Sequence, residues 1–228
     1  SLVLGMHSFG LEETGDYAKA EETGRRALSV NPRDCWAHHA VAHVMEMQGR
    51  PEDGIGWMSA REAHWSTEDN FFQVHNWWHK ALFHLDLDQS TEAVAIYDAH
   101  IVAGDSIVAA DLVDASAMLW RLKMSGIDIG DRCSPIADRW SLHADGKLYG
   151  FNDWHAAMVY LGAGRESEVD NLLATCREQA AGGSEAAGWA ATIALPLIEG
   201  FRAWHQDDFA LAVERLHPVR RFAHAFGG

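Results

Sequence analysis

The chain has 228 residues, 48% of them hydrophobic and 22% charged, which is the composition of a folded globular protein. Its 33 acidic and 18 basic side chains give a formal charge of −15. This argues against nucleic acid or an anionic membrane as a partner, because phosphate groups are bound by clustered Lys and Arg. Three widely spaced cysteines without a CxxC motif indicate neither a disulfide framework nor a cysteine-rich zinc site. No apolar run reaches the roughly 18 residues of a membrane span, and we expect a cytoplasmic protein.

The first part of the chain follows a helical-repeat pattern. The segment from Gly15 to Pro32 is similar to the second half of a tetratricopeptide repeat, whose period is about 34 residues. With Ser1 as repeat position 1, Gly15, Ala20, Ala27 and Pro32 fall where that superfamily has its small residues and its terminal proline. The match predicts a hairpin of two helices.

The turn inside this first unit then recurs along the chain, which predicts units that start near residues 1, 35, 74, 112, 150 and 193. The recurring turns are Gly49-Arg50-Pro51, Asp88-Gln89-Ser90, Ser125-Gly126, Gly162-Ala163-Gly164 and Asp207-Asp208-Phe209. We therefore expect an all-α, tetratricopeptide-repeat-like α-solenoid of about six hairpins in a right-handed superhelix, forming a single domain over residues 1–228. The absence of an initiator Met leads us to expect the core of a longer protein.

Two neighbouring predicted helices, over residues 36–48 and 74–87, each carry a pair of histidines four residues apart. Four residues advance about 400° around a helix, so both members of a pair lie on one face, one turn apart. The pairs are His39 with His43, and His75 with His79.

In tetratricopeptide repeats the first helix of each hairpin lines a concave groove through positions near 2, 5, 6, 9 and 12. In the second, third and fifth units these positions hold polar and aromatic residues, namely Trp36, His39, His43, Glu46, His75, Trp78, His79, Trp154 and His155. Residues that only pack are expected elsewhere, as are Val41, Met45, Trp77 and Ala81. Isolated histidines such as His7 and His38 are expected to be half-buried polar residues whose hydrogen bonds are satisfied.

The chain also resembles one family within this superfamily, the tetratricopeptide repeat protein 38 family. The resemblance is carried by the segments Trp36–Arg50, Val74–Leu85, Asp114–Ser116, Leu119–Leu122 and Phe151–His155, and it covers essentially the whole chain. It implies an α-solenoid of degenerate repeats in a soluble intracellular protein. It does not imply a reaction, so the function has to be argued from the site.

The interpretation that we favour is a binding module whose groove holds a peptide, protein or small-molecule ligand. The histidines would hydrogen-bond the ligand and the tryptophans would cover its apolar part. The residues assigned to this role are Trp36, His39, His43, Glu46, His75, Trp78, His79 and His155.

The alternative is a metal-dependent enzyme in which His39, His43, His75 and His79 meet at one ion. Zinc or iron suits imidazole ligands, and Glu46 or Asp114 would complete the shell or act as a general base. Neither pair belongs to an HExxH motif, so a peptidase of that type is not supported. A third hypothesis is metal-free acid–base catalysis by one histidine oriented by either carboxylate.

Overall fold

The computed structural model describes residues 1–102 and 104–225, with side chains as far as Phe222. This part of the chain forms helices and turns and contains no strand, so the predicted all-α class is confirmed. The chain divides into two compact units, Ser1–Asp105 and Ser106–Gly228. The prediction of one continuous repeat domain stays a prediction.

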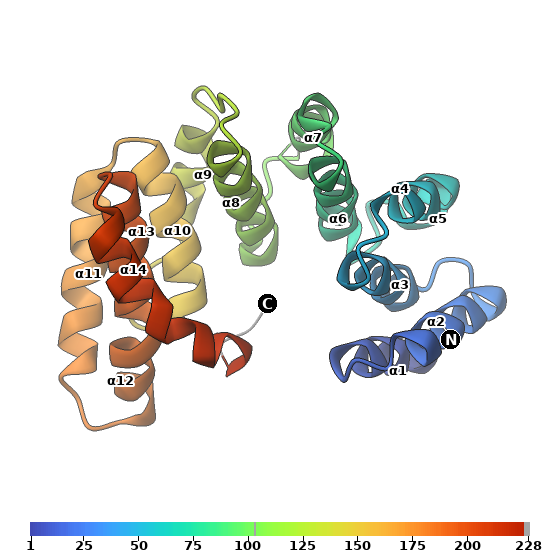
Figure 1. The fold of residues 1–228 in the computed structure, drawn as a ribbon, viewed down its shortest axis with the longest axis horizontal. Helices are drawn as coiled ribbons and strands as arrows, with labels where there is room; N and C mark the ends of the chain where they lie inside the picture. Colours follow the sequence, from blue (N-terminus) through green and yellow to red (C-terminus); the bar gives the residue numbers. More distant parts are fainter. Residues whose placement is uncertain (103, 226–228) are drawn as a thin grey trace. The chain divides into compact units, whose positions relative to one another are not determined.

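The first unit is built from seven α-helices and a short π-helix (Figure 1). They are α1 (Leu2–Glu13), α2 (Tyr17–Val30), α3 (Cys35–Met47), α4 (Pro51–Ala60), α5 (Glu62–Trp65), α6 (Gln73–Asp86), α7 (Ser90–Ile96) and the π-helix η1 (Tyr97–Ile101). Within this unit α1 packs on α2 and α3, and α3 packs in turn on α4 and α6. The helices α1, α3 and α6 therefore follow one another as neighbours.

The second unit continues the pattern of packed helix pairs. It contains α8 (Ala109–Met124), α9 (Cys133–Trp140), α10 (Gly150–Gly162), α11 (Glu166–Ala180), α12 (Glu185–Trp189), the π-helix η2 (Ala190–Ala194), α13 (Leu195–His205), α14 (Phe209–Val219) and the 3-10 helix η3 (Arg220–Ala225). Within it α8 packs on α9, α10 on α11 and α13 on α14. The sequence predicts a loop over residues 127–135, and the predicted end of this loop is wrong, because α9 already begins at Cys133.

The two helices that carry the histidine pairs lie one residue earlier than predicted, as α3 and α6. Helix α3 begins at Cys35 because the side chain of Asp34 accepts a hydrogen bond from the Ala37 backbone N–H, which would otherwise have no intrahelical partner. The residues expected only to pack are buried, with Val41 0%, Met45 2%, Trp77 4% and Ala81 0% exposed. The faces of α3 and α6 that pack and those that carry histidines are thus distinct.

The six predicted turns share one backbone conformation. The fifteenth residue of every predicted unit has a positive φ, and these residues are Gly15, Gly49, Asp88, Gly126, Gly164 and Asp207. The next residue in each turn donates its N–H to the carbonyl five residues earlier, as from Arg50 to Met45 at 2.9 Å and from Gln89 to His84 at 2.8 Å. This is the Schellman arrangement that ends helices, and its left-handed position favours Gly and tolerates Asp.

Close approach of α1 to α3 depends on a glycine. A Cβ atom on Gly5 would lie 2.5 Å from Oδ1 of Asp34 and 2.8 Å from the Ala37 backbone nitrogen, so no other residue fits there without a shift of one helix. The same contact lets the far end of α1, with Phe9 and Glu12, lie against the histidine face of α3.

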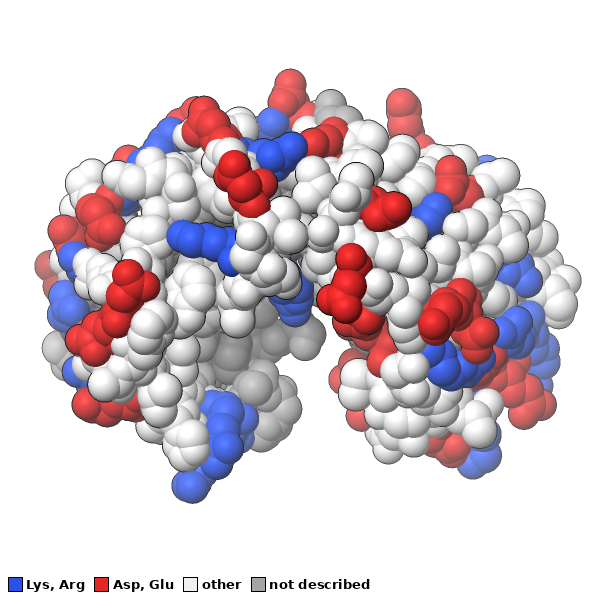
Figure 2. Space-filling view, turned by 45° about the horizontal axis from the view of Figure 1, so that its top comes forward, with Lys and Arg blue, Asp and Glu red and all other residues white. Residues whose placement is uncertain are grey.

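In Figure 2 acidic and basic side chains are interspersed over the face that is drawn. None of the described helices is both long enough and apolar enough to cross a bilayer.

A matched pair of glycine substitutions tests the turn conformation. We expect Gly49→Ala to lower the free energy of unfolding by about 1–2 kcal/mol, because φ is +62° at this position and nothing lies within 4 Å of an added Cβ. Gly10→Ala, in the middle of α1 and equally uncrowded, should raise it by about 0.5–1 kcal/mol. Urea unfolding of both variants measures the difference, and equal effects of the two substitutions would contradict the assignment.

Candidate metal centre

The two histidine pairs meet in one cluster between α3 and α6. One ring nitrogen of each histidine lies within 4.8 Å of a ring nitrogen of every other, and the four residues are His39, His43, His75 and His79. His39 and His79 are 4% and 1% exposed, and the other two are partly exposed. Four imidazoles gathered in this way can hold a metal ion.

Hydrogen bonds fix the orientation of one ligand pair. Nδ1 of His79 lies 2.7 Å from Oε2 of Glu46, and because an ionised carboxylate only accepts, this nitrogen carries the proton. Nε2 of His79 then presents a lone pair to Nε2 of His75 at 3.2 Å. Tetrahedral zinc, with Zn–N distances near 2.0–2.1 Å, places its ligand nitrogens about 3.3–3.4 Å apart. The spacing of these two nitrogens fits such an ion.

His39 carries the strongest indication that a group is bound here. Both of its ring nitrogens are buried, and neither has a hydrogen-bond partner among the described residues. A buried polar atom without a partner costs on the order of 1–3 kcal/mol. Its ring is surrounded instead by other imidazoles, with ring centroids 4.3 Å from His43 and 4.8 Å from His75. A metal ion would satisfy one of these nitrogens directly.

Aromatic rings enclose the cluster. Phe72 stacks on His39 at 4.6 Å and 8°, and Phe9 of α1 lies 5.1 Å from the same ring. On the side of α6, Trp78 stacks on His75 at 5.4 Å and 9°. These rings exclude water from much of the cluster and so strengthen electrostatic interactions inside it.

Burial favours the neutral form of two of the four imidazoles, His39 and His43. Desolvation lowers the pKa of His43 to about 4, and desolvation together with neighbouring histidines lowers the pKa of His39 well below its usual value. The opposite shift occurs at Glu12, where burial and then repulsion by Glu13 and Glu46 raise the pKa to about 7. Neutral imidazole is the form that binds metal, so His39 and His43 are in the form that metal binding requires at neutral pH.

Of the other residues that the sequence analysis assigned to the site, one lies beside the cluster and three lie in the second compact unit. Trp36 lies beside the cluster, 6.2 Å from the His39 ring and 4.8 Å from the Phe72 ring. The second compact unit, Ser106–Gly228, contains Trp154, His155 and Asp114, so their assignment to a shared groove stays a prediction.

Three residues at the cluster were missed in the sequence analysis: Phe9, Glu12 and Phe72. Phe9 and Glu12 occupy positions 9 and 12 of the first predicted unit, the positions that selected His43 and Glu46 in the second. The repeat register could therefore have identified Phe9 and Glu12, but the groove positions were not read off for the first predicted repeat. Phe72 precedes α6 and lies outside that register.

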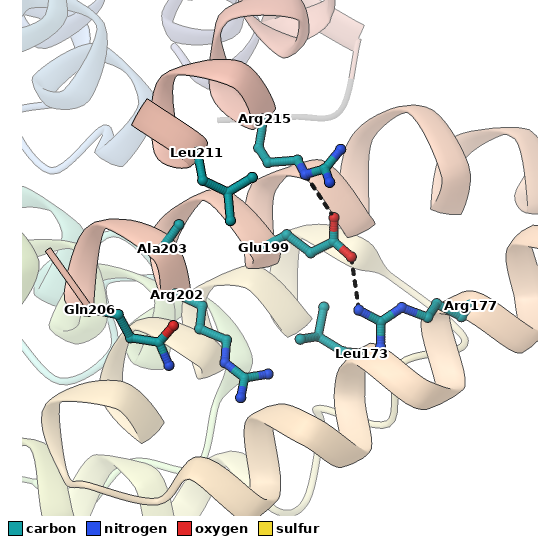
Figure 3. Close-up of a pocket in the computed structure, with 8 residues that line it drawn as sticks. All are labelled: Leu173, Arg177, Glu199, Arg202, Ala203, Gln206, Leu211 and Arg215. Atoms are coloured by element: carbon teal, nitrogen blue, oxygen red, sulfur yellow. Dashed lines mark hydrogen bonds and ion pairs between the residues drawn. The ribbon is translucent and has the colours of Figure 1, made fainter. Parts of the chain in front are cut away.

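A separate cavity of about 240 Å³ lies in the second unit, between α11, α13 and α14 (Figure 3). Arg177 and Arg215 both reach Glu199 in the close-up, at 2.8 and 3.3 Å. The third arginine there, Arg202, is paired with Asp170 at 2.7 Å. With every guanidinium paired, the cavity is an ionic contact between helices rather than an anion site.

Comparison with known proteins adds no family to this description. No model of a protein family matches the chain, and no solved structure matches it. The resemblance to the tetratricopeptide repeat protein 38 family therefore stays a prediction.

His155 provides a prediction about acid stability. It is 4% exposed, its Nδ1 donates to the Phe151 carbonyl at 2.8 Å, and burial lowers its pKa to about 4. Its contribution is complete above the unfolded-state pKa near 6.5 and is lost as the pH falls towards 4. Relative to His155→Leu, the wild type should thus lose on the order of 2–3 kcal/mol between pH 7 and pH 4 in urea unfolding. A difference that stays constant over this range would contradict the shift.

Proposed function

We propose that the protein binds one divalent transition-metal ion through His39, His43, His75 and His79. The observation that carries this proposal is the meeting of four imidazoles, one of which, His39, is buried with neither ring nitrogen hydrogen-bonded to a described residue. The donor set contains nitrogen only, which suits zinc and, among redox metals, iron, nickel or copper, and does not suit magnesium or calcium. Zinc is the first ion to test and iron the second.

We propose in addition that the chain is a tetratricopeptide-repeat-like solenoid. Two observations support this arrangement. Each of the six predicted units has a pair of helices in contact, and each has a left-handed residue at its fifteenth position. In such a repeat the first helices of successive hairpins are neighbours. Helices α1, α3 and α6, which all belong to the compact unit Ser1–Asp105, meet that condition.

Metal binding rather than catalysis is the function that the cluster favours. Four protein ligands saturate a tetrahedral zinc ion, whereas catalytic zinc sites keep a position open for water or substrate. Glu46, the candidate base, is engaged with Nδ1 of His79 and so is better placed to orient a ligand than to take a proton from a substrate. A reaction would need a metal with a higher coordination number.

A ligand-binding groove is the second candidate function, and one observation favours it. His75 and Trp78 are stacked in parallel and both are partly exposed, which leaves an aromatic edge of the cluster accessible to an organic ligand. A carboxylate-bearing peptide or small molecule that reached this edge would meet a bound metal ion as well as an aromatic surface.

Calorimetric titration of the tag-free apoprotein with Zn²⁺ tests the metal proposal, with one ion per chain expected. Sites of this kind supply roughly 12 kcal/mol of binding free energy, of which one of four ligands accounts for about a quarter. Removing one ligand should therefore weaken binding on the order of 100-fold. The variant to use is His39→Leu, because it removes two unpartnered nitrogens and the apoprotein should keep its stability or gain some.

His7→Leu is the matched control, since it removes an exposed histidine of α1 that is not part of the cluster. It should leave the affinity unchanged. Saturating zinc should also stabilise the wild type by about 2.7 kcal/mol at 100 times the dissociation constant. Absence of binding by the wild type, or equal affinity of wild type and His39→Leu, would refute the proposal.

A further inference from the structure

Two carboxylates contact the histidine cluster, Glu12 from α1 and Glu46 from α3. Oε2 of Glu46 lies 2.7 Å from Nδ1 of His79, and Oε2 of Glu12 lies 3.6 Å from Nδ1 of His43. Both contacts are to the Nδ1 atom, and the two histidines are neighbours with ring centroids 4.5 Å apart. The two glutamates thus make the same kind of approach to two members of one cluster.

Glu12 has no evident structural reason to be where it is. Its side chain is 4% exposed, and its Oε2 has no hydrogen-bond partner among the described residues. No lysine or arginine of the described chain forms an ion pair with it, and its nearest charged neighbours, Glu13 and Glu46, repel it. An ionised carboxylate that is buried without a partner is costly, and the rise in the pKa of Glu12 to about 7 reflects that cost. A positive charge placed beside Glu12 would hold it in the ionised form.

A divalent ion among the four imidazoles would supply this charge. Neutral imidazoles leave the full charge of the ion in a largely dry, aromatic site, where it needs nearby compensation. Two ionised carboxylates balance a divalent ion and leave a monovalent or trivalent one unbalanced. In metal sites, ligating histidines commonly donate their second N–H to such a carboxylate, which fixes the ring and raises its basicity.

We infer that Glu12 and Glu46 are positioning residues of a charge-neutral divalent-metal site, in which they accept hydrogen bonds from Nδ1–H of His43 and His79 while Nε2 of each ring binds the ion. The inference rests on the proposed metal binding and deepens it in two ways. It selects the charge of the ion, and it makes α1 the third helix of the site. In the metal-bound form the Glu12 contact would have to shorten from 3.6 Å to the length of a hydrogen bond, about 2.7–3.2 Å.

The participation of α1 has a structural basis in Gly5. Because α1 approaches α3 at this residue, the carboxylate two turns further along α1 reaches the histidine face. A bound ion would therefore tie α1 to α3 through Glu12 and His43, and α3 to α6 through the four ligands. Metal binding should order three successive helices rather than two.

Glu12→Gln and Glu13→Gln form a matched pair for the test, because the two substitutions remove the same charge one residue apart. Glu12 is buried against His43, whereas Glu13, which also has a carboxylate oxygen within 4.8 Å of a His43 ring nitrogen, is exposed and therefore screened by solvent. Zn²⁺ affinity is measured for both full-length variants by titration against a chromophoric chelator at 0.15 M salt. We expect Glu12→Gln to bind 10–100-fold more weakly than the wild type, and Glu13→Gln to stay within about threefold.

Two further readouts separate positioning from a general structural role. Without metal, Glu12→Gln should melt at the same temperature as the wild type or higher, since it removes a buried unpaired carboxylate. In the zinc-loaded wild type, proton NMR should show slowly exchanging Nδ1–H signals of His43 and His79. The His43 signal should move upfield and exchange faster in Glu12→Gln, and the His79 signal should do so in Glu46→Gln, because an amide oxygen is a weaker acceptor than a carboxylate.

Equal affinities of wild type and Glu12→Gln would overturn the inference while leaving the four-histidine site intact. Equal losses in Glu12→Gln and Glu13→Gln would also overturn it, because they would reveal only a long-range effect of charge. Failure of the wild type to bind zinc would instead refute the proposed function itself.

Discussion

The site depends on the desolvation of four imidazole rings that lie close together between α3 and α6. Burial holds His39 and His43 neutral, and packing leaves both nitrogens of His39 without a partner. An aromatic core of the same shape would avoid this cost, so packing alone gives no reason for histidine at these positions. An ion bound to one nitrogen of His39 would remove part of this cost, and the carboxylates beside His43 and His79 lie where such an ion would favour them.

The backbone sets up this cluster through repetition. Turns of one conformation end the first helix of each predicted unit, so equivalent positions on successive helices face the same way. Position 12 accordingly supplies Glu12 from α1 and Glu46 from α3, and these two carboxylates approach the same cluster. The recurring turn conformation thus brings together residues that lie far apart in the sequence, and no additional loop is needed to form the site.

Much of the fold and the centre of the site could be predicted because both follow from helical periodicity. Spacing of i, i+4 placed each histidine pair on one face, and the repeat register correctly predicted Val41 and Trp77 to be buried. The start of α9 at Cys133 was missed, since Pro135 was taken as a loop residue although proline is tolerated in the first turn of a helix. The unpartnered state of His39 and the burial of Glu12 were beyond the sequence, because they depend on how closely neighbouring helices approach.

The most direct test of the central claim is X-ray absorption spectroscopy at the zinc edge of the loaded protein. The account predicts a first shell of four nitrogen atoms at about 2.0–2.1 Å with the multiple-scattering pattern of imidazole. A first shell dominated by oxygen or sulfur, or one with fewer than three imidazoles, would contradict it.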